Sequence, residues 1–239
     1  MTEETNKALA KKNNFVELEF IGRNLTNNEV FDTNIESEAK KINPEAKIKP
    51  LTVCIGQNMV VKGLDDYLEG KELNKKYNLK LSPENAFGKR DSKLIRMIPI
   101  KMFLEQKIYP QAGMTLALDN SLVKVVSVSG GRVMVDFNNP LAGKDIEFEF
   151  TIKKIINDNT SKVSALQTFL FGQEFPFEVD ESRKMIVFQD IKLTPILNMF
   201  RPKFQEILGL DVEILEKSKK NIETKMEEKI DSKVSEEKD

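Results

Sequence analysis

Apolar and polar residues alternate with a period of two in several short stretches of the chain. FVELEFI at 15–21 and KKYNLKL at 75–81 show this pattern, which is typical of strands with one buried face. In NMVVKGLDDYLE at 58–69 the apolar residues recur at helical spacing, and Gly70 is a typical helix stop. We therefore expect a short helix that lies across a sheet, with a further strand at 51–55.

The second half of the chain repeats these signals. LVKVVSVSGGRVMVDF indicates two strands joined by a tight turn at the two glycines, and 146–156 is an alternating strand. A polar break at 157–162 separates this part from an α-β-β-α-β pattern. Its expected elements are a helix at 163–171 capped by Thr160 or Ser161, strands at 175–179, 184–189 and 212–215, and a helix at 194–208 that Pro202 would kink or interrupt.

Both ends of the chain are polar. Residues 1–14 have the composition of a flexible lead-in. Residues 217–239 are charged throughout, with an apolar residue at every fourth position from Ile222 to Val234. Such a thin stripe favours a frayed helix or a disordered tail over a helix that docks on a partner.

Length and charge bound the class of protein. A chain of 239 residues has room for one or two domains, and a formal net charge of −1 leaves no basic field to attract nucleic acid or an anionic membrane. The N-terminal residues lack the apolar core of a signal peptide. No apolar run approaches the roughly 20 residues of a membrane span. We therefore expect a cytoplasmic protein that binds neither nucleic acid nor membranes.

The chain contains no histidine and a single cysteine, Cys54. The usual general base and the commonest metal ligand are therefore missing, and a zinc site is nearly excluded. Cys54 lies in an apolar strand, where a small core residue is the simplest interpretation. We expect no metal and no cofactor, and a fold built without disulfides.

Three motifs occur in order along residues 16–157. VELEFIGRNLTNNEVFDT contains a Phe-x-Gly element and a Phe-Asp pair. IGQNMVVKGLDDYLEG is followed by LSPENAFG, and VDFNNPLAGKDIEFEFTIKKI comes last. Together these motifs resemble the FK506-binding-protein family of peptidyl-prolyl cis–trans isomerases, and the last one resembles its SlyD-like branch.

The resemblance implies an α+β fold, in which an antiparallel β-sheet wraps on a short helix. About 50 residues ahead of NNPLAGK resemble the insert-in-flap domain of the SlyD-like branch, a small β-rich module with chaperone activity. The region after the polar break resembles the C-terminal α/β extension of long archaeal members. The expected parts are a flexible N-terminus (1–14), a discontinuous prolyl isomerase domain (15–91 plus 142–157), the insert-in-flap chaperone domain (92–141), a C-terminal α+β domain (160–216) and a charged tail (217–239).

By resemblance, the isomerase site is an apolar pocket. Phe31, Phe148 and Leu64 would grip the proline ring. The backbone amide of Val61 would hold the substrate carbonyl, and Asp32 would form a polar wall. Rotation about an X–Pro bond breaks no covalent bond, so the pocket needs no nucleophile, acid, base or metal. The catalytic positions carried over by motif are Phe20, Phe31, Asp32, Val60, Val61, Leu64, Phe87 and Phe148.

The sequence departs from the family pattern at aromatic positions. Phe20 and Phe87 stand where the family has tyrosines, and Leu64 replaces the tryptophan of the small drug-binding members. The Phe87 position normally offers a hydroxyl to a bound ligand, so one hydrogen bond, worth ~0.5–1.5 kcal/mol net, is missing. These departures bear on macrolide-drug affinity more than on isomerase activity.

Substrate contacts outside the catalytic set are expected from one strand and from the insert. Leu51 matches the family strand ahead of the helix. In the insert, IRMIPIKMFL is apolar enough to bind unfolded segments. Packing in the insert's own core explains it equally well. The candidate substrate-binding residues are Leu51, Ile95, Met97, Ile98 and Met102.

Two functions remain open. The first is a peptidyl-prolyl isomerase with a chaperone insert, acting on unfolded or partly folded proline-containing polypeptides. The second is a non-enzymatic holdase or assembly module with a weakened pocket, which the missing hydroxyls favour; Phe31-Asp32 and LSPENAFG favour the enzyme. Without the resemblance, the pocket residues would be read as core residues. A homodimer through the C-terminal domain is compatible with either function.

Overall fold

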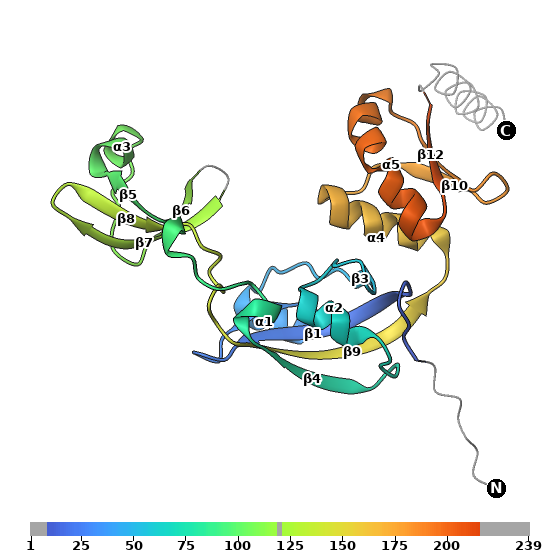
Figure 1. The fold of residues 1–239 in the computed structure, drawn as a ribbon, viewed down its shortest axis with the longest axis horizontal. Coiled ribbons are helices and arrows are strands. Elements are labelled where there is room, and N and C mark those ends of the chain that lie inside the picture. The colour runs from blue at the N-terminus through green and yellow to red at the C-terminus, as the bar shows by residue number, and fades with distance from the viewer. Residues whose placement is uncertain (1–8, 119–120, 216–239) are drawn as a thin grey trace, which may run out of the picture. The chain divides into compact units, whose positions relative to one another are not determined.

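A computed structural model describes residues 9–118 and 121–215. They form two compact units, and the chain passes from the first to the second at Ile155 and Ile156 (Figure 1). The first unit contains two separate hydrophobic cores and the second contains one. None of the described helices is long and apolar enough to cross a membrane.

The first core lies on a five-stranded sheet with the order β2-β1-β9-β4, in which β3 also pairs with β1. The first seven residues of β9 alternate strictly, because Ile146, Phe148, Phe150 and Ile152 are all buried in this core. The α+β fold and the four strands predicted for this domain are confirmed. They are β1 (Phe15–Asn24), β3 (Leu51–Cys54), β4 (Lys76–Leu81) and β9 (Ile146–Ile156). The fifth strand, β2 (Val30–Thr33), was not predicted.

A short helix, α2 (Lys62–Leu68), lies across this sheet (Figure 1). Its Leu64 and Leu68 side chains are buried in the core. The prediction placed its start four residues too early. Gly56 and Asn58 have left-handed backbone angles, with φ of 83° and 54°, so residues 56–61 form a turn instead. A second short helix, α1 (Glu36–Ile42), follows β2.

Residues 9–14 pack against this domain, contrary to the prediction of a flexible lead-in over the whole of 1–14. Ala10 is buried, and its N–H donates to the Lys71 carbonyl at 2.9 Å. Its own carbonyl accepts from the Gly70 N–H at 2.8 Å. At the other end of the segment, the Ile55 N–H donates to the Asn14 carbonyl at 3.0 Å. Sequence polarity hid this packing because most of it is made by backbone groups.

The second core belongs to a four-stranded antiparallel sheet with the order β5-β8-β7-β6. Gly130 and Gly131 connect β7 to β8 with φ of 55° and 75°, which confirms the predicted tight hairpin. Phe103 and four valines of β7 and β8 are buried between the sheet and α3. The elements are η2 (Ser92–Leu94), β5 (Ile95–Pro99), α3 (Ile100–Glu105), β6 (Thr115–Leu118), β7 (Ser121–Ser129) and β8 (Arg132–Asp136).

The second unit has the predicted α-β-β-α-β order around a three-stranded sheet. β10 pairs with β11 in antiparallel fashion, and β12 pairs with β11 in parallel after the crossover through α5. The elements are α4 (Asn159–Phe171), β10 (Phe177–Asp180), β11 (Met185–Phe188), η3 (Ile191–Leu193), α5 (Thr194–Leu208) and β12 (Asp211–Ile214). The predicted charged tail at 217–239 lies outside the described residues.

Two local details in this unit differ from the prediction. Of the two effects expected of Pro202, a kink or an interruption, the interruption does not occur: α5 runs from Thr194 to Leu208, with Leu197 and Phe204 buried in the core on either side of Pro202. The cap of α4 is Asp158, whose carboxylate accepts from the Ser161 N–H at 2.7 Å.

Candidate functional site

A pocket of about 270 Å³ opens on the first core, between the sheet and α2. Strands β1, β2, β3 and β9, the turn before α2, α2 itself and the loop after β4 each contribute to its wall. All eight residues carried over by motif as catalytic lie around it. Its lining consists of Phe20, Phe31, Asp32, Leu51, Met59, Val60, Val61, Leu64, Phe87 and Phe148.

Four phenylalanine rings form the aromatic wall of the pocket. The Phe31 ring stands edge-on to Phe87, with centroids 5.7 Å apart, and edge-on to Phe148 at 5.8 Å. The Phe20 ring is tilted against the Phe148 ring, with centroids 6.1 Å apart. Tilted and edge-to-face ring pairs are mutually attractive. The rings therefore hold one another in a fixed apolar surface.

Gly22 is needed for this ring arrangement. A Cβ built at Gly22 would lie 2.6 Å from Cζ of Phe31 and 3.1 Å from Cε1 of Phe148. The backbone of β1 and the Phe31 ring can approach this closely only when no side chain stands between them. Gly22 is the glycine of the Phe-x-Gly element, and nothing in the sequence alone showed which ring it accommodates.

The turn at residues 56–61 carries Val60 and Val61 to the pocket. The buried Asp65 carboxylate fixes this turn, accepting from the Gly56 N–H at 2.9 Å and from the Asn58 N–H at 2.8 Å. Met59 Sδ accepts from the Cys54 N–H at 3.1 Å. The roles of Asp65 and Met59 were missed. The role of Asp65 could have been predicted, because the sequence places its carboxylate between Leu64 and Leu68, on the apolar side of the helix, where a buried carboxylate needs hydrogen-bond donors.

The loop after β4 brings Phe87 to the pocket through η1 (Pro83–Asn85). The Gly88 N–H donates to the Pro83 carbonyl at 2.7 Å and closes the loop. A Cβ at Gly63, in the first turn of α2, would lie 2.7 Å from the Asn85 carbonyl oxygen. The loop therefore packs directly on the start of α2.

Asp32 is the one charged side chain among the described residues that line the pocket. It is exposed at the rim, where the apolar surroundings partly desolvate its carboxyl group. That desolvation raises the pKa of Asp32, and a hydrogen bond with the Thr33 backbone only partly opposes it. A site with one carboxylate and otherwise apolar walls suits the binding of an apolar ring with little water around it.

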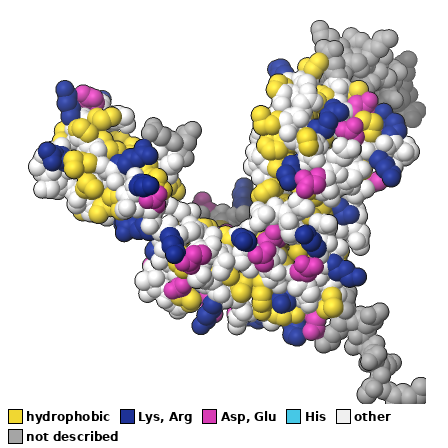
Figure 2. Space-filling view, in the orientation of Figure 1, with side chains coloured by type: hydrophobic (Ala, Val, Ile, Leu, Met, Phe, Trp, Pro, Cys, Tyr) yellow, Lys and Arg dark blue, Asp and Glu magenta, His cyan; other side chains and the backbone are white. Residues whose placement is uncertain are grey.

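The four candidate substrate-binding residues of the insert lie away from this pocket. Ile98 and Met102 line a separate apolar hollow of about 110 Å³ on the second core. Met97 and Met102 are each 55% exposed, whereas Ile95 and Ile98 are half-buried. Ile98 therefore belongs to the insert's own core, and the two methionines are available at its surface. Figure 2 shows several yellow hydrophobic side chains exposed on this face of the insert.

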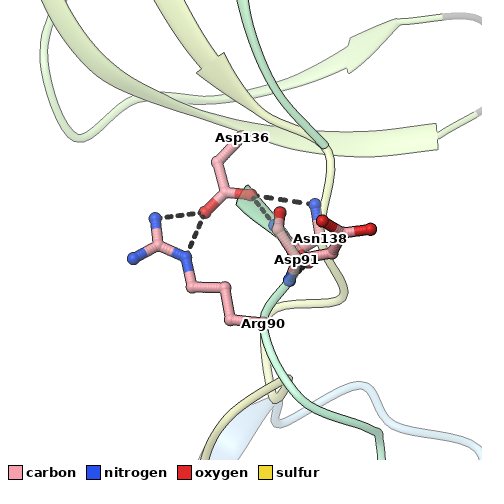
Figure 3. A network of polar contacts seen from close by, with 4 residues as sticks. All are labelled: Arg90, Asp91, Asp136 and Asn138. Carbon is pink, nitrogen blue, oxygen red and sulfur yellow. Dashed lines mark hydrogen bonds and ion pairs between the residues drawn. The ribbon is translucent and has the colours of Figure 1, made fainter. Parts of the chain in front are cut away.

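A polar network joins the two chain segments that lead into and out of the insert (Figure 3). Arg90 donates from Nε and Nη2 to Asp136 Oδ2 at 2.9 and 2.5 Å. Asn138 donates from Nδ2 to Asp136 Oδ1 at 2.7 Å and to the Asp91 carbonyl at 2.9 Å, and it accepts from the Asp91 N–H at 2.8 Å. The network ties residues 90–91 to residues 136–138.

The charge state of Asp136 follows from these contacts. Partial burial would raise its pKa, but the hydrogen bonds from Asn138 and the ion pair with Arg90 outweigh burial and hold the pKa below its usual range. Asp136 is therefore ionised near neutral pH. Within residues 9–118 and 121–215 no group of three His, Cys, Asp or Glu side chains could hold a metal ion.

Comparison with known proteins gives two family matches. Residues 6–104 match the family "FKBP-type peptidyl-prolyl cis-trans isomerase", and residues 96–141 match "FKBP26, IF domain". The first match contains seven of the eight carried-over pocket residues, and Phe148 lies beyond its end.

Among individual proteins, the chain is similar to archaeal and bacterial isomerases. It is 30% identical over 150 residues to the short-type peptidyl-prolyl cis-trans isomerase of Methanocaldococcus jannaschii, a match that covers 62% of this chain and 94% of that protein. It is 30% identical over 129 residues to the FKBP-type peptidyl-prolyl cis-trans isomerase SlyD of Aeromonas hydrophila, with 53% of this chain and 56% of that protein covered. The SlyD of Helicobacter pylori is 28% identical over 140 residues, with 56% and 69% covered.

Proposed function

Because this chain belongs to the family of FKBP-type peptidyl-prolyl cis-trans isomerases, we propose that its aromatic pocket binds the proline of polypeptide substrates and accelerates rotation about the X–Pro bond. The observation that carries the proposal is the gathering of eight motif residues from distant parts of the chain around one pocket of about 270 Å³. A chance set of core residues would not all face the same hollow.

Rotation about the X–Pro bond is accelerated by an apolar environment and needs no reactive side chain. Amide resonance opposes rotation with a barrier of roughly 20 kcal/mol. In the twisted state the carbonyl oxygen loses negative charge, so an apolar slot favours that state over the planar one. Each ~1.4 kcal/mol of such preference accelerates the reaction tenfold. A pocket with one rim carboxylate and otherwise apolar walls provides this environment.

We assign the roles as follows. Phe31 and Phe148 stack against the proline ring from two sides, and Leu64, on α2, forms the floor. The Val61 N–H, which has no hydrogen-bond acceptor among the described residues, binds the carbonyl of the residue before proline. Asp32 stands beside the twisting bond as the polar wall. Leu51, Val60, Phe20 and Phe87 complete the apolar enclosure.

For the insert we propose chaperone activity. Met97 and Met102 expose flexible apolar side chains, which adapt to varied sequences. Unfolded or partly folded polypeptides that bind there would raise the local concentration of proline segments near the isomerase pocket. The whole protein would then act in the cytoplasm on folding chains, without nucleic acid or membrane partners.

The test is a refolding reaction limited by proline isomerisation, with catalytic amounts of the parent, Asp32→Ala and Phe148→Ala. Acceleration by the parent, reduced about tenfold or more in both variants, supports the isomerase and its pocket. Asp66→Ala is the matched control, because Asp66 is an exposed carboxylate on α2 that does not line the pocket. Equal rates for parent and pocket variants would contradict the assigned roles.

The alternative is a holdase without isomerase activity. The absence of hydroxyl groups at Phe20 and Phe87 is the observation that favours it. No acceleration by the parent, with aggregation of the refolding chain still suppressed, would establish the holdase and exclude the enzyme.

A homodimer through the second unit is a separate proposal. Light scattering on the full chain and on a chain ending at Asp158 tests it. If the second unit forms the interface, the full chain is a dimer and the shorter chain is a monomer; the same number of subunits in both would contradict the proposal.

A further inference from the structure

Strand β1 has two different partners along one edge. Residues Phe15 to Leu18 pair with β3, and Ile21 to Arg23 pair with β2. Between these two ladders lies a seam at Glu19 and Phe20, where neither β3 nor β2 continues. Three backbone groups of β1 face this seam: the Leu18 carbonyl, the Phe20 N–H and the Phe20 carbonyl. Backbone groups without a partner in such a half-buried place are costly, so their partners matter.

The side chain of Asn34 fills the seam. Its Oδ1 accepts from the Phe20 N–H at 2.8 Å, and its Nδ2 donates to the Leu18 carbonyl at 2.6 Å. The hydroxyl of the preceding residue, Thr33, donates to the Phe20 carbonyl at 2.7 Å. The Asn34 backbone N–H also donates to the Phe20 carbonyl, at 3.4 Å. Asn34 and Thr33 together therefore bind the Leu18 carbonyl and both backbone groups of Phe20, on the stretch of β1 between its pairings with β3 and β2.

A carboxamide is the group that this position requires. It must accept from an N–H and donate to a carbonyl at the same time, and this pair of partners also fixes which end of the amide is oxygen. A carboxylate of the same shape could accept but would set a negative charge against the Leu18 carbonyl. A hydroxyl is too short to reach both groups, and glutamine is one methylene too long.

The seam is where three walls of the pocket begin. Phe20 lies on β1 and is bonded to Asn34 directly. Asp32 lies on β2, which ends one residue before Asn34, and Leu51 is the β3 residue paired with Leu18. All three line the pocket. We propose that Asn34 is a positioning residue of the isomerase, which sets the spacing between the walls that carry Phe20, Asp32 and Leu51. This inference rests on the proposed function of the pocket.

The test compares Asn34→Ala and Asn34→Asp with the parent on a short prolyl peptide, at a temperature where all are folded. A misplaced wall weakens the fit to the twisted bond, so we expect kcat to fall by about ten- to hundredfold while KM stays within about twofold. A purely structural residue would lower the unfolding midpoint and leave kcat per folded molecule unchanged. If Asn34→Ala fails to fold, the test rests on the kcat of Asn34→Asp, whose side chain has the same shape and can still accept from the Phe20 N–H.

Asn138→Ala is the matched control. The Asn138 carboxamide also accepts from one backbone N–H and donates to one backbone carbonyl, both of Asp91, but at the insert junction. We expect its peptide kcat to equal that of the parent. If Asn34→Ala and Asn138→Ala both keep the parent kcat, the inference is wrong.

Crystal structures of the Asn34 variants separate this inference from the proposed function. A changed Cα separation between Asp32 and Leu51 supports the positioning role even if the parent has no isomerase activity, in which case only the proposed function fails. Unchanged positions of Phe20, Asp32 and Leu51 would overturn the inference even in an active enzyme.

Discussion

At the scale of single residues, the shape of the pocket depends on Gly22, which lacks a side chain, and on Asp32, its one charged lining residue among the described residues. Gly22 brings the β1 backbone within contact of the Phe31 ring, and that ring in turn stands edge-on to Phe87 and Phe148. Asp32 is held at the rim of the same apolar surface. Small changes at Gly22 and Asp32 should therefore act directly on the pocket.

Gly22→Ala should displace the Phe31 ring, because the new methyl group would overlap Cζ at 2.6 Å. Alanine is otherwise acceptable in a strand, so we expect kcat/KM on a prolyl peptide to fall by about tenfold with a loss of roughly 1–3 kcal/mol in the free energy of unfolding. The second-site change Phe31→Leu removes the overlap and should restore the lost stability. A Gly22→Ala protein with full activity would contradict this account.

Asp32→Asn should increase stability at neutral pH while it lowers activity. The pKa of Asp32 is raised in the folded chain, so ionisation costs folding free energy. That cost is absent below the unfolded pKa of about 3.9 and is fully present above the raised folded value. Urea unfolding from pH 3 to pH 7 should thus show the variant gaining on the parent as pH rises. A stability difference between variant and parent that stays constant from pH 3 to pH 7 would contradict this account.

At the scale of elements, the turn before α2 is held from inside the helix. The carboxylate of Asp65 accepts from Gly56 and Asn58, so the helix and the turn that carries Val60 and Val61 form one unit. Residues 9–14 add bonds at Ile55 and at Gly70, beyond both ends of this unit. The position of the Val61 amide is therefore set by α2 and its surroundings.

Asp65→Ala should destabilise the fold and weaken the pocket together. Two N–H groups lose their acceptor, at a cost of about 1–3 kcal/mol each where water cannot reach them. Urea unfolding should show this loss, and kcat/KM should fall because Val60 and Val61 are no longer fixed. Asp66→Ala, one residue along the same helix, should change neither quantity. A stable Asp65→Ala protein would mean that water replaces the carboxylate.

At the scale of the whole molecule, the pocket and the insert belong to separate hydrophobic cores, and two chain segments connect them. Each has its own core, and the Arg90–Asp136–Asn138 network ties the two connecting segments together (Figure 3). The pocket should therefore act on short peptides without help from this network. Action on long unfolded chains should need the junction to hold the insert in place.

Arg90→Ala should separate these two activities. Removing the guanidinium leaves Asp136 without its cationic partner and loosens the junction, while the pocket lining is untouched. We expect peptide kcat/KM to stay within about twofold of the parent and catalysed refolding of a protein to fall by about tenfold. Equal losses on both substrates would mean that the network supports the pocket directly. If Arg90→Ala keeps the parent's activity on both the peptide and the refolding protein, the junction has no role in the reaction.

The periodic elements and the pocket set could be predicted from the sequence. Alternation located β1, β4 and β9, and motif order located eight pocket residues. Helix ends were less well predicted, since the left-handed Asn58 delayed the start of α2 and core packing carried α5 through Pro202. Segments held by backbone bonds, such as residues 9–14, gave no signal in side-chain polarity.

The sequence by itself determined which faces are apolar, because burial of alternating or helically spaced side chains is a local property of the chain. Together with motif order, it determined the family of the fold. The tertiary structure alone decided that Gly22 must yield space to Phe31, that Asp65 fixes a turn, and that Asn34 closes the seam between β2 and β3. These contacts join residues brought together only by folding, and their energies depend on distances and partners that no local pattern encodes.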